Sequence, residues 1–226
     1  MKVRVTDVGD ACVVLEYPAR VDPQVNSACV AVADAVSRAG VAGVRDVTAT
    51  YYTVAVHLDP TVADRDAVAE LLMRAAETVG EPPAVSGRLH ELPVCYGGEW
   101  GPDLTDVARF GQCAEEEVIR LHSDQVYRVY MMGFLPGFAY LGQVDDRIRM
   151  GRRETPRLRV PAGAVGIAGP QTGVYPVESP GGWRIIGQSW VRPYDERRPN
   201  PFLFRAGDEV RFVPVSVDEY RRMVTG

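Results

Sequence analysis

Lysine is almost absent from this chain of 226 residues. Lys2 is the only lysine, and every other basic side chain is arginine. The interior of the chain therefore offers no amine for a Schiff base and no lysine for a phosphate-binding loop. The net charge of −5 gives no indication of a nucleic-acid partner.

Cysteine and histidine are scarce, and long apolar runs are missing. The four cysteines form no CxxC pair, and the three histidines do not stand at metal-ligand spacing with them. We therefore expect reduced thiols and no metal site. The N-terminal residues lack a signal-peptide core, and no apolar run reaches the length of a membrane span. These absences favour a cytoplasmic protein without a membrane partner.

The first 80 residues show alternating and helical patterns in the order ββαββα. Asp22 followed by Pro23 predicts a helix start, and Gly40 predicts its end. Two helices on one face of an antiparallel sheet are expected, which is a small α+β sandwich. We predict strands at 2–6, 11–17, 44–50 and 52–58, and helices at 22–40 and 64–80.

A short segment rich in proline and glycine follows this half. Glu81-Pro82-Pro83 together with Ser86-Gly87 is the natural linker. The sequence therefore predicts two domains, at residues 1–85 and 86–226.

The stretch from Arg157 to Gln188 organises the second half. It reads RLRVPAGAVGIAGPQTGVYPVESPGGWRIIGQ, and its glycines and prolines leave only short apolar runs. Such a pattern is typical of short, kinked strands in a compact β-barrel. Polar side chains that could recognise a ligand are Arg157, Arg159, Gln171, Thr172 and Glu178. A stiff structural region with solvated arginines is an equally good interpretation of these residues alone.

The rest of the second half supplies further elements and two candidate features. We predict strands at 89–96, 126–132, around 190–191 and at 209–215, and helices at 103–110, 114–121 and 217–224. His122 ends a helix, where the dipole stabilises a cation, or it serves as an acid/base group. Phe134, Pro136 and Phe138 lie in a predicted rigid loop over residues 133–142 and form either ordinary core or the wall of an apolar pocket.

Five motifs resemble one known family. They are YGGEWGPDL (96–104), the pair His122-Ser123, YMMGFLPGFAYLG (130–142), TPRLRVPAGAVGIAGPQTGVYPVESPGGWRIIGQ (155–188) and RAGDEVRFVPVS (205–216). In this order they resemble the family of 5-oxoprolinase B subunits, also called KipI-like or allophanate hydrolase subunit 1. One departure is Pro170, where the family usually has a glycine.

The resemblance implies a fold and an activity. The fold is an α+β N-terminal domain followed by a cyclophilin-like β-barrel. The activity is ATP-dependent opening of 5-oxoproline to glutamate, together with a homologous KipA-like subunit and a LamB/YcsF-type subunit. ATP with Mg²⁺ is expected at a site shared with the partner or lying mainly in it.

Roles for single residues follow from motif position and chemistry. Arg157 and Arg159 would stabilise the anionic transition state, and Gln171 would hydrogen-bond the lactam amide. His122 would move a proton near neutral pH. The predicted substrate-binding positions are Phe134, Pro136, Phe138, Pro161, Gly163, Thr172 and Glu178.

Two alternatives to the enzyme subunit stay open. Some relatives inhibit a sporulation histidine kinase, which would require an exposed apolar patch instead of convergent polar groups. Related modules also belong to urea carboxylase, so a urea or allophanate-type amide is another possible substrate.

Overall fold

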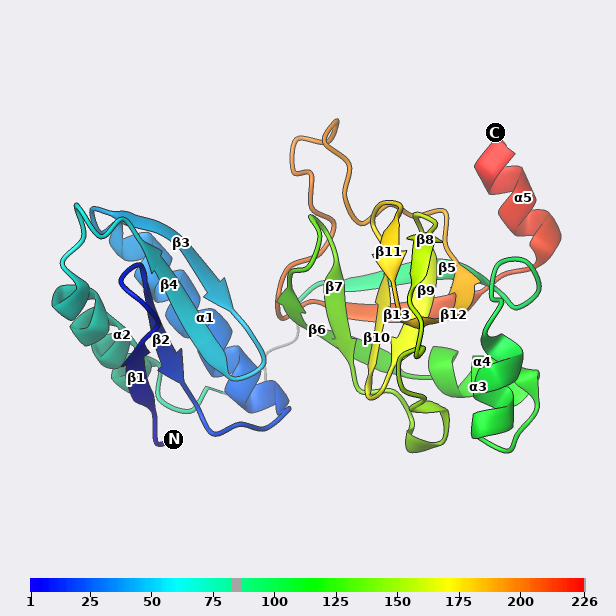
Figure 1. The fold of residues 1–226 in the computed structure, drawn as a ribbon, viewed down its shortest axis with the longest axis horizontal. Helices are drawn as coiled ribbons and strands as arrows, with labels where there is room; N and C mark the ends of the chain where they lie inside the picture. The colour runs from blue at the N-terminus through cyan, green and yellow to red at the C-terminus, as the bar shows by residue number, and fades with distance from the viewer. Residues whose placement is uncertain (83–86, 226) are drawn as a thin grey trace. The chain divides into compact units, whose positions relative to one another are not determined.

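The chain forms two compact units, Met1–Val85 and Ser86–Gly226, in a computed structural model (Figure 1). The structure describes residues 1–82 and 87–225. Pro83 and Ser86 of the predicted linker therefore lie outside the described residues.

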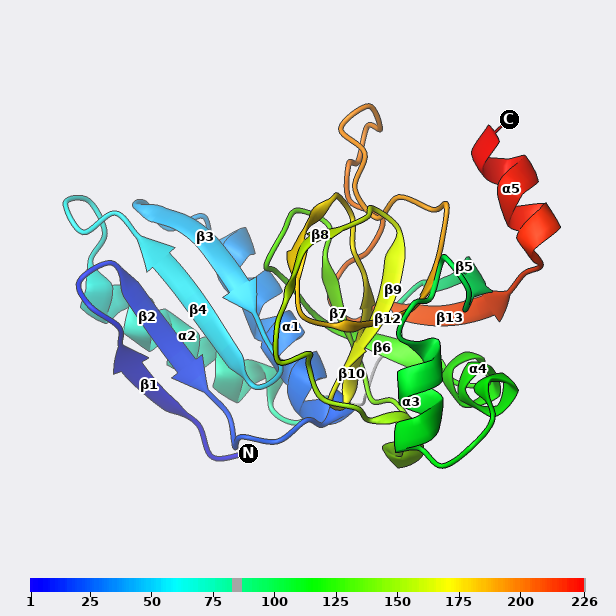
Figure 2. The same cartoon turned by 45° about the vertical axis from the view of Figure 1, so that its right-hand side comes forward.

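The first unit is a four-stranded antiparallel sheet with two helices on one face (Figure 2). The strand order is β1-β2-β4-β3, and the chain order confirms the predicted ββαββα arrangement. Between the sheet and the helices lies one core of small and branched side chains. The elements are β1 (Arg4–Asp7), β2 (Cys12–Glu16), α1 (Pro23–Ala39), β3 (Val44–Ala49), β4 (Thr53–Leu58) and α2 (Arg65–Val79).

Helix α1 begins and ends at the predicted residues. Asp22 accepts hydrogen bonds from the backbone N–H groups of Gln24 at 2.7 Å and Val25 at 3.2 Å. These bonds satisfy two donors that the first helical turn leaves unpaired. Gly40 adopts the left-handed conformation, with φ of 60°, that ends many helices.

The second unit is a closed seven-stranded barrel. Its strand order is β10-β7-β6-β13-β5-β12-β9, and β9 pairs with β10 to close the ring. The strands are β5 (Leu89–Tyr96), β6 (Val126–Met132), β7 (Ala139–Gly142), β9 (Ala164–Ala168), β10 (Gln171–Val174), β12 (Arg184–Gln188) and β13 (Glu209–Pro214). A separate antiparallel ribbon pairs β8 (Arg157–Val160) with β11 (Ser179–Gly181). The predicted α+β class with a C-terminal barrel is confirmed.

The first and last strands of the barrel are neighbours. Strand β13 pairs in parallel with β5, in a register that sets Glu209 beside Leu89 and Pro214 beside Val94. The other neighbour of β13 is β6, which runs antiparallel to it. Because β5 and β13 are parallel, their N-terminal ends meet at one end of the barrel.

Successive side chains alternate between the inside and the outside of the barrel. Leu141, Val165, Ile167 and Val174 belong to the inner core. Their neighbours in β7, β9 and β10 therefore face outward. This outer face carries a second, smaller core built from aromatic and aliphatic side chains.

The remaining helices surround the barrel, and two predicted boundaries need correction. Helices α3 (Leu104–Phe110), α4 (Glu115–Ser123), the 3₁₀ turn η1 (Asp146–Ile148) and α5 (Val217–Thr225) complete the unit. Residues 139–142 form β7, although the sequence indicated a loop, because proline and glycine before them hide the alternation. Residues 190–191 form no strand, since the chain leaves the barrel after β12. Among the described residues, no helix has the length and apolar character to cross a membrane.

Candidate functional site

His122 lies in the barrel core, although it comes from helix α4. Its ring is fully buried and stacks on Phe212 of β13, with ring centroids 4.5 Å apart. Its Nδ1 is 2.7 Å from the hydroxyl of Tyr96, and its Nε2 is 2.8 Å from the hydroxyl of Thr172. Both ring nitrogens therefore have partners inside the protein.

The hydrogen-bond chain defines the tautomer of this histidine. The hydroxyl of Thr172 donates to the carbonyl oxygen of Gly166 at 3.0 Å. A hydroxyl has a single proton, so Thr172 accepts a second proton from Nε2–H of His122. Nδ1 is then the acceptor for the hydroxyl of Tyr96, and the ring is neutral.

Burial accounts for the acid–base properties of this group. It lowers the pKa of His122 from 6.5 to about 3, because no solvent reaches the imidazolium form. Burial, and to a lesser extent Tyr127, raises the pKa of Tyr96 well above its ordinary value. These surroundings do not support a proton shuttle near neutral pH, and they make His122 and Thr172 a link between α4 and β10.

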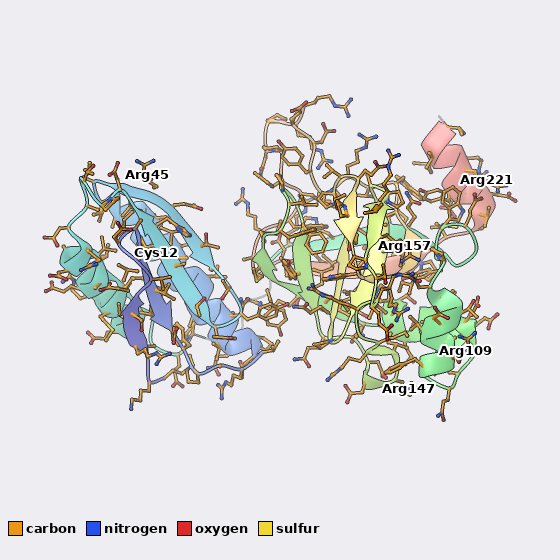
Figure 3. All side chains as sticks on the ribbon, viewed as in Figure 1. Cys12, Arg45, Arg109, Arg147, Arg157 and Arg221 are labelled. Atoms are coloured by element: carbon orange, nitrogen blue, oxygen red, sulfur yellow. The ribbon has the colours of Figure 1, made fainter. Side chains whose placement is uncertain are left out.

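Asp103 holds two arginines and one strand together. Arg157 donates to both carboxylate oxygens, at 2.7 and 2.9 Å, and Arg153 donates to Oδ1 at 2.9 Å. The backbone N–H of Ile185 donates to Oδ2 at 2.6 Å. The carboxylate is almost fully buried, so the fork of Arg157, labelled in Figure 3, is fixed in one orientation.

The pKa of Asp103 reflects this network. Burial acts to raise it, but hydrogen bonds from Arg157 and Ile185 and the charges of both arginines hold it below its ordinary value of 3.8. Asp103 also precedes α3, yet its side chain makes no capping bond to that helix. The sequence indicated only a helix start here, because aspartate is a common residue at that position.

An aromatic cluster covers the outer face of β7, β9 and β10. The ring of Phe138 lies at its centre, with Tyr140, Tyr175 and Trp183 at centroid distances of 5.0, 5.4 and 5.3 Å. All three contacts are edge-to-face, the arrangement that aromatic pairs prefer. Phe138 is buried at the centre of this cluster, as a core residue would be, and the pocket wall stays a prediction.

Two glycines make room for these rings. A Cβ atom on Gly173 would lie 3.3 Å from both Phe138 and Trp183, and one on Gly166 would lie 3.1 Å from Trp183. The alternation of glycine in this stretch thus gives the barrel a flat outer surface on which large rings pack.

Several of the predicted site residues are divided between the outer face of the barrel and its interior. Gln171 is half-buried and faces outward from β10, next to Thr172, which faces inward. Phe134 is 61% exposed and contacts Phe138 edge-to-face at 5.6 Å, and Pro136 is exposed. The structure therefore associates Gln171 and the two phenylalanines with the outer face and separates His122 from them by the barrel wall.

Arg159 and Glu178 pair with each other on the β8–β11 ribbon. The guanidinium lies 2.8 Å from the carboxylate, and both side chains are largely exposed to solvent. Such a pair adds little stability and leaves the charge of Arg159 compensated.

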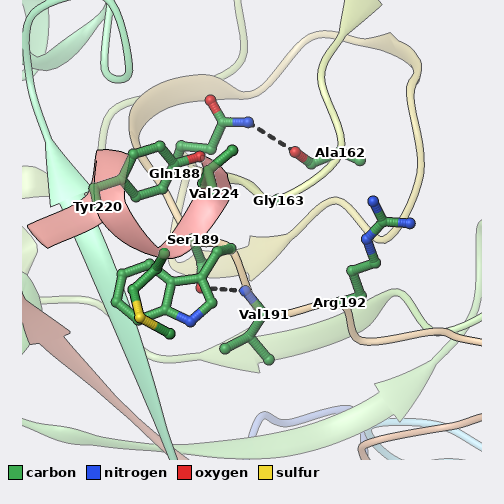
Figure 4. A pocket seen from close by; sticks show the side chains of 10 residues that line it. Ala162, Gly163, Gln188, Ser189, Val191, Arg192, Tyr220 and Val224 are labelled. Atoms are coloured by element: carbon green, nitrogen blue, oxygen red, sulfur yellow. Dashed lines mark hydrogen bonds between the residues drawn. The ribbon is translucent and has the colours of Figure 1, made fainter. Parts of the chain in front are cut away.

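Pro161 and Gly163 lie in the turn that follows β8. Gly163 lines a cavity of about 300 Å³ (Figure 4). The cavity lies between the turn, the segment after β12 and helix α5. The amide of Gln188 donates to the carbonyl oxygen of Ala162 at 2.8 Å across its rim. In its wall, the ring centroids of Trp190 and Tyr220 lie 5.9 Å apart. Sequence reasoning did not connect these residues, because α5 and β12 are distant along the chain.

Comparison with known proteins identifies the family. Residues 3–204 match the family described as carboxyltransferase domain, subdomain C and D. The chain belongs to this family. The B subunit of 5-oxoprolinase from Bacillus subtilis is 50% identical over 147 residues, which are 65% of this chain and 61% of the relative. The resemblance inferred from the five motifs is confirmed.

Solved structures agree with the observed fold. A conserved uncharacterized protein of Pyrococcus horikoshii is 39% identical, with a TM-score of 0.58 over 96% of this chain and 100% of that one. The urea amidolyase of K. lactis has the same fold, with a TM-score of 0.82 and 18% identity over 99% of this chain and 15% of that chain.

Proposed function

We propose that this chain is one component of an ATP-dependent 5-oxoprolinase that opens the lactam of 5-oxoproline to glutamate. The observation that carries the proposal is the 50% identity over 147 residues with a protein named as a 5-oxoprolinase subunit. The chain spans about three fifths of that relative's length. The five motifs that carry the resemblance all lie in the second unit of this chain.

The proposed enzyme works as an assembly with a homologous KipA-like subunit and a LamB/YcsF-type subunit. A lactam carbonyl is a poor electrophile, and ATP with Mg²⁺ supplies the phosphoryl group that makes its oxygen a leaving group. The present chain is expected to be inactive alone, because it contributes one part of a shared site.

The outer face of the barrel is the surface that we assign to the lactam. The edge of its aromatic cluster excludes water beside Tyr140, which is half-buried. Gln171 offers an amide to the lactam N–H, and Arg152 offers an exposed guanidinium nearby. Burial raises the pKa values of Tyr140 and Tyr175, and the positive charge of Arg152 partly opposes this effect. Arg157, fixed by Asp103, positions the adjoining ribbon and does not act as a free cation.

The test is a glutamate assay on the chain produced together with both partner subunits, with ATP and 5-oxoproline added. Gln171→Ala and Arg152→Ala should each lower kcat/KM by about tenfold or more, since each removes a charged or polar contact with substrate. Arg109→Ala, on the exposed face of α3, is the matched control (Figure 3).

Two results would count against the proposal in different ways. An assembled complex that forms no glutamate from 5-oxoproline would reject the reaction. Full activity of both outer-face variants would reject the assigned surface but keep the reaction.

A further inference from the structure

A second cavity, of about 370 Å³, opens at the end of the barrel where β5 and β13 begin. Because these strands are parallel, the residues before each of them meet at this end. The loop between β12 and β13, orange in Figure 1, projects beyond the barrel and supplies another wall. The lining residues are Arg88, His90, Arg198, Asn200, Phe202, Leu203, Arg205 and Asp208, and we call this cavity the arginine cleft.

The carboxylate that lines the arginine cleft, that of Asp208, has three hydrogen-bond partners within the protein. Asp208 accepts from the backbone N–H of Arg88 at 3.0 Å through Oδ1. Its Oδ2 accepts from the backbone N–H of Arg205 at 3.1 Å and pairs with Nε2 of His90 at 3.0 Å. His90 and Asp208 are both well buried, so this carboxylate forms a fixed floor and is not a partner for the arginine side chains.

The walls of the cleft present hydrogen-bond donors. Among residues 1–82 and 87–225, the side chains of Arg88 and Arg205 form no ion pair. Arg198 donates to the carbonyl oxygen of Arg192 at 2.5 Å and forms a long ion pair with Asp195, with 3.9 Å between Nε and Oδ2. The Oδ1 atom of Asn200 accepts from the backbone N–H of Phe202, which leaves the amide nitrogen as a donor. A chain of net charge −5 thus concentrates three guanidinium groups around one cavity.

We propose that the arginine cleft binds the phosphates of a nucleotide. Guanidinium groups match phosphate oxygens with paired hydrogen bonds, and a cavity of this size is typical of small-molecule sites. Phe202 is 43% exposed at the rim, and it offers a ring face for the base. The identity of the nucleotide as ATP rests on the proposed function, whereas the preference for phosphate rests on the cleft alone.

The direct test measures binding of ATP to the whole chain by calorimetry, without partner subunits and without 5-oxoproline. Wild-type protein should bind ATP, inorganic phosphate should compete with it, and adenosine should not bind. Binding should weaken with added salt and persist in EDTA, because arginines contact the phosphates directly. Arg88→Ala combined with Arg205→Ala should weaken binding by about tenfold or more, and Phe202→Ala by a smaller factor.

The control variant is Arg109→Ala, which removes one exposed cation from α3 and should bind ATP as the wild type does. Circular dichroism of the double variant should match the wild type, since neither arginine side chain holds the fold. Equal ATP affinity in the double variant and the wild type, or no binding by the wild-type chain, would overturn the inference.

The complete assembly separates this inference from the proposed function. An active 5-oxoprolinase whose KM for ATP is unchanged in the double variant would reject the arginine cleft and keep the reaction. A chain that binds ATP through the cleft, in an assembly that makes no glutamate, would keep the cleft and reject the reaction.

Discussion

At the scale of single residues, the buried polar groups hold the second unit together. His122 joins α4 to β5 through the hydroxyl of Tyr96 and to β10 through the hydroxyl of Thr172. Asp103 joins Arg153 and Arg157 to β12. Removing one partner of such a network leaves the other buried without compensation, which usually costs more than the bond itself contributes.

The neutral state of His122 predicts a pH dependence of stability. Its pKa is about 3 in the folded chain and near 6.5 when exposed, so the unfolded state binds the extra proton between these values. This contribution to stability is complete above pH 6.5 and is lost as the pH falls toward 3, by up to about 1.4 kcal/mol per pH unit. The free energy of unfolding, measured in urea at several pH values in this range, should change less steeply with pH in His122→Gln than in the wild type.

The control for this experiment is His57→Gln, at an exposed position of β4, which should keep the wild-type slope. Carboxylates also titrate in the lower part of the range, so the difference between the two variants carries the information. Identical slopes in all three proteins would contradict the buried neutral imidazole.

At the scale of elements, glycine positions decide how the outer face of the barrel packs. Gly166 and Gly173 lie under the rings of Phe138 and Trp183. The adjacent inward positions all carry branched side chains, namely Val165, Ile167, Thr172 and Val174. At these two positions the strands have no side chain on the outer face. This leaves room for the rings of a second core outside the barrel.

Gly173→Ala should destabilise the barrel unit by about 1–3 kcal/mol. The added Cβ would lie 2.9 Å from the carbonyl oxygen of Ala139 and 3.3 Å from two aromatic rings. Urea unfolding followed by tryptophan fluorescence measures the loss, and the near-ultraviolet circular dichroism should change because Trp183 is displaced. Gly151→Ala, whose Cβ would meet no atom within 4 Å, should behave as the wild type.

Local patterns predicted most elements but not the site. Asp22, Pro23 and Gly40 define α1 through bonds within a few residues, and such signals are visible in the sequence. The clamp on Asp103 joins residues 50 and 54 positions apart, and the arginine cleft joins β5 to a loop more than 100 positions away. These long-range contacts depend on the order of the strands in the barrel, and the pattern of a single sequence does not reveal that order.

At the scale of the whole molecule, the two units have separate cores and different chromophores. The first unit packs around Leu72 and Val56, and the second around the barrel interior. All three tryptophans, Trp100, Trp183 and Trp190, belong to the second unit. Tryptophan fluorescence therefore reports on the barrel unit, whereas far-ultraviolet circular dichroism reports on both.

Leu72→Ala should lower the stability of the first unit by about 2–5 kcal/mol, because it leaves a cavity in a fully buried site. In urea, part of the circular dichroism signal should then be lost at a lower concentration. The midpoint of the tryptophan transition should stay at its wild-type value. A parallel shift of both signals would show that the units unfold as one.

The pairing of β5 with β13 has a consequence for synthesis on the ribosome. Strand β13 fills the place between β5 and β6, and in chain order it follows all the other strands of the barrel. A nascent chain therefore carries an open, unfinished sheet until β13 has emerged, whereas residues 1–82 can fold much earlier. Late closure across such a sequence distance is slow, so the growing barrel is the stage at which newly made chains are most exposed to aggregation or to chaperones.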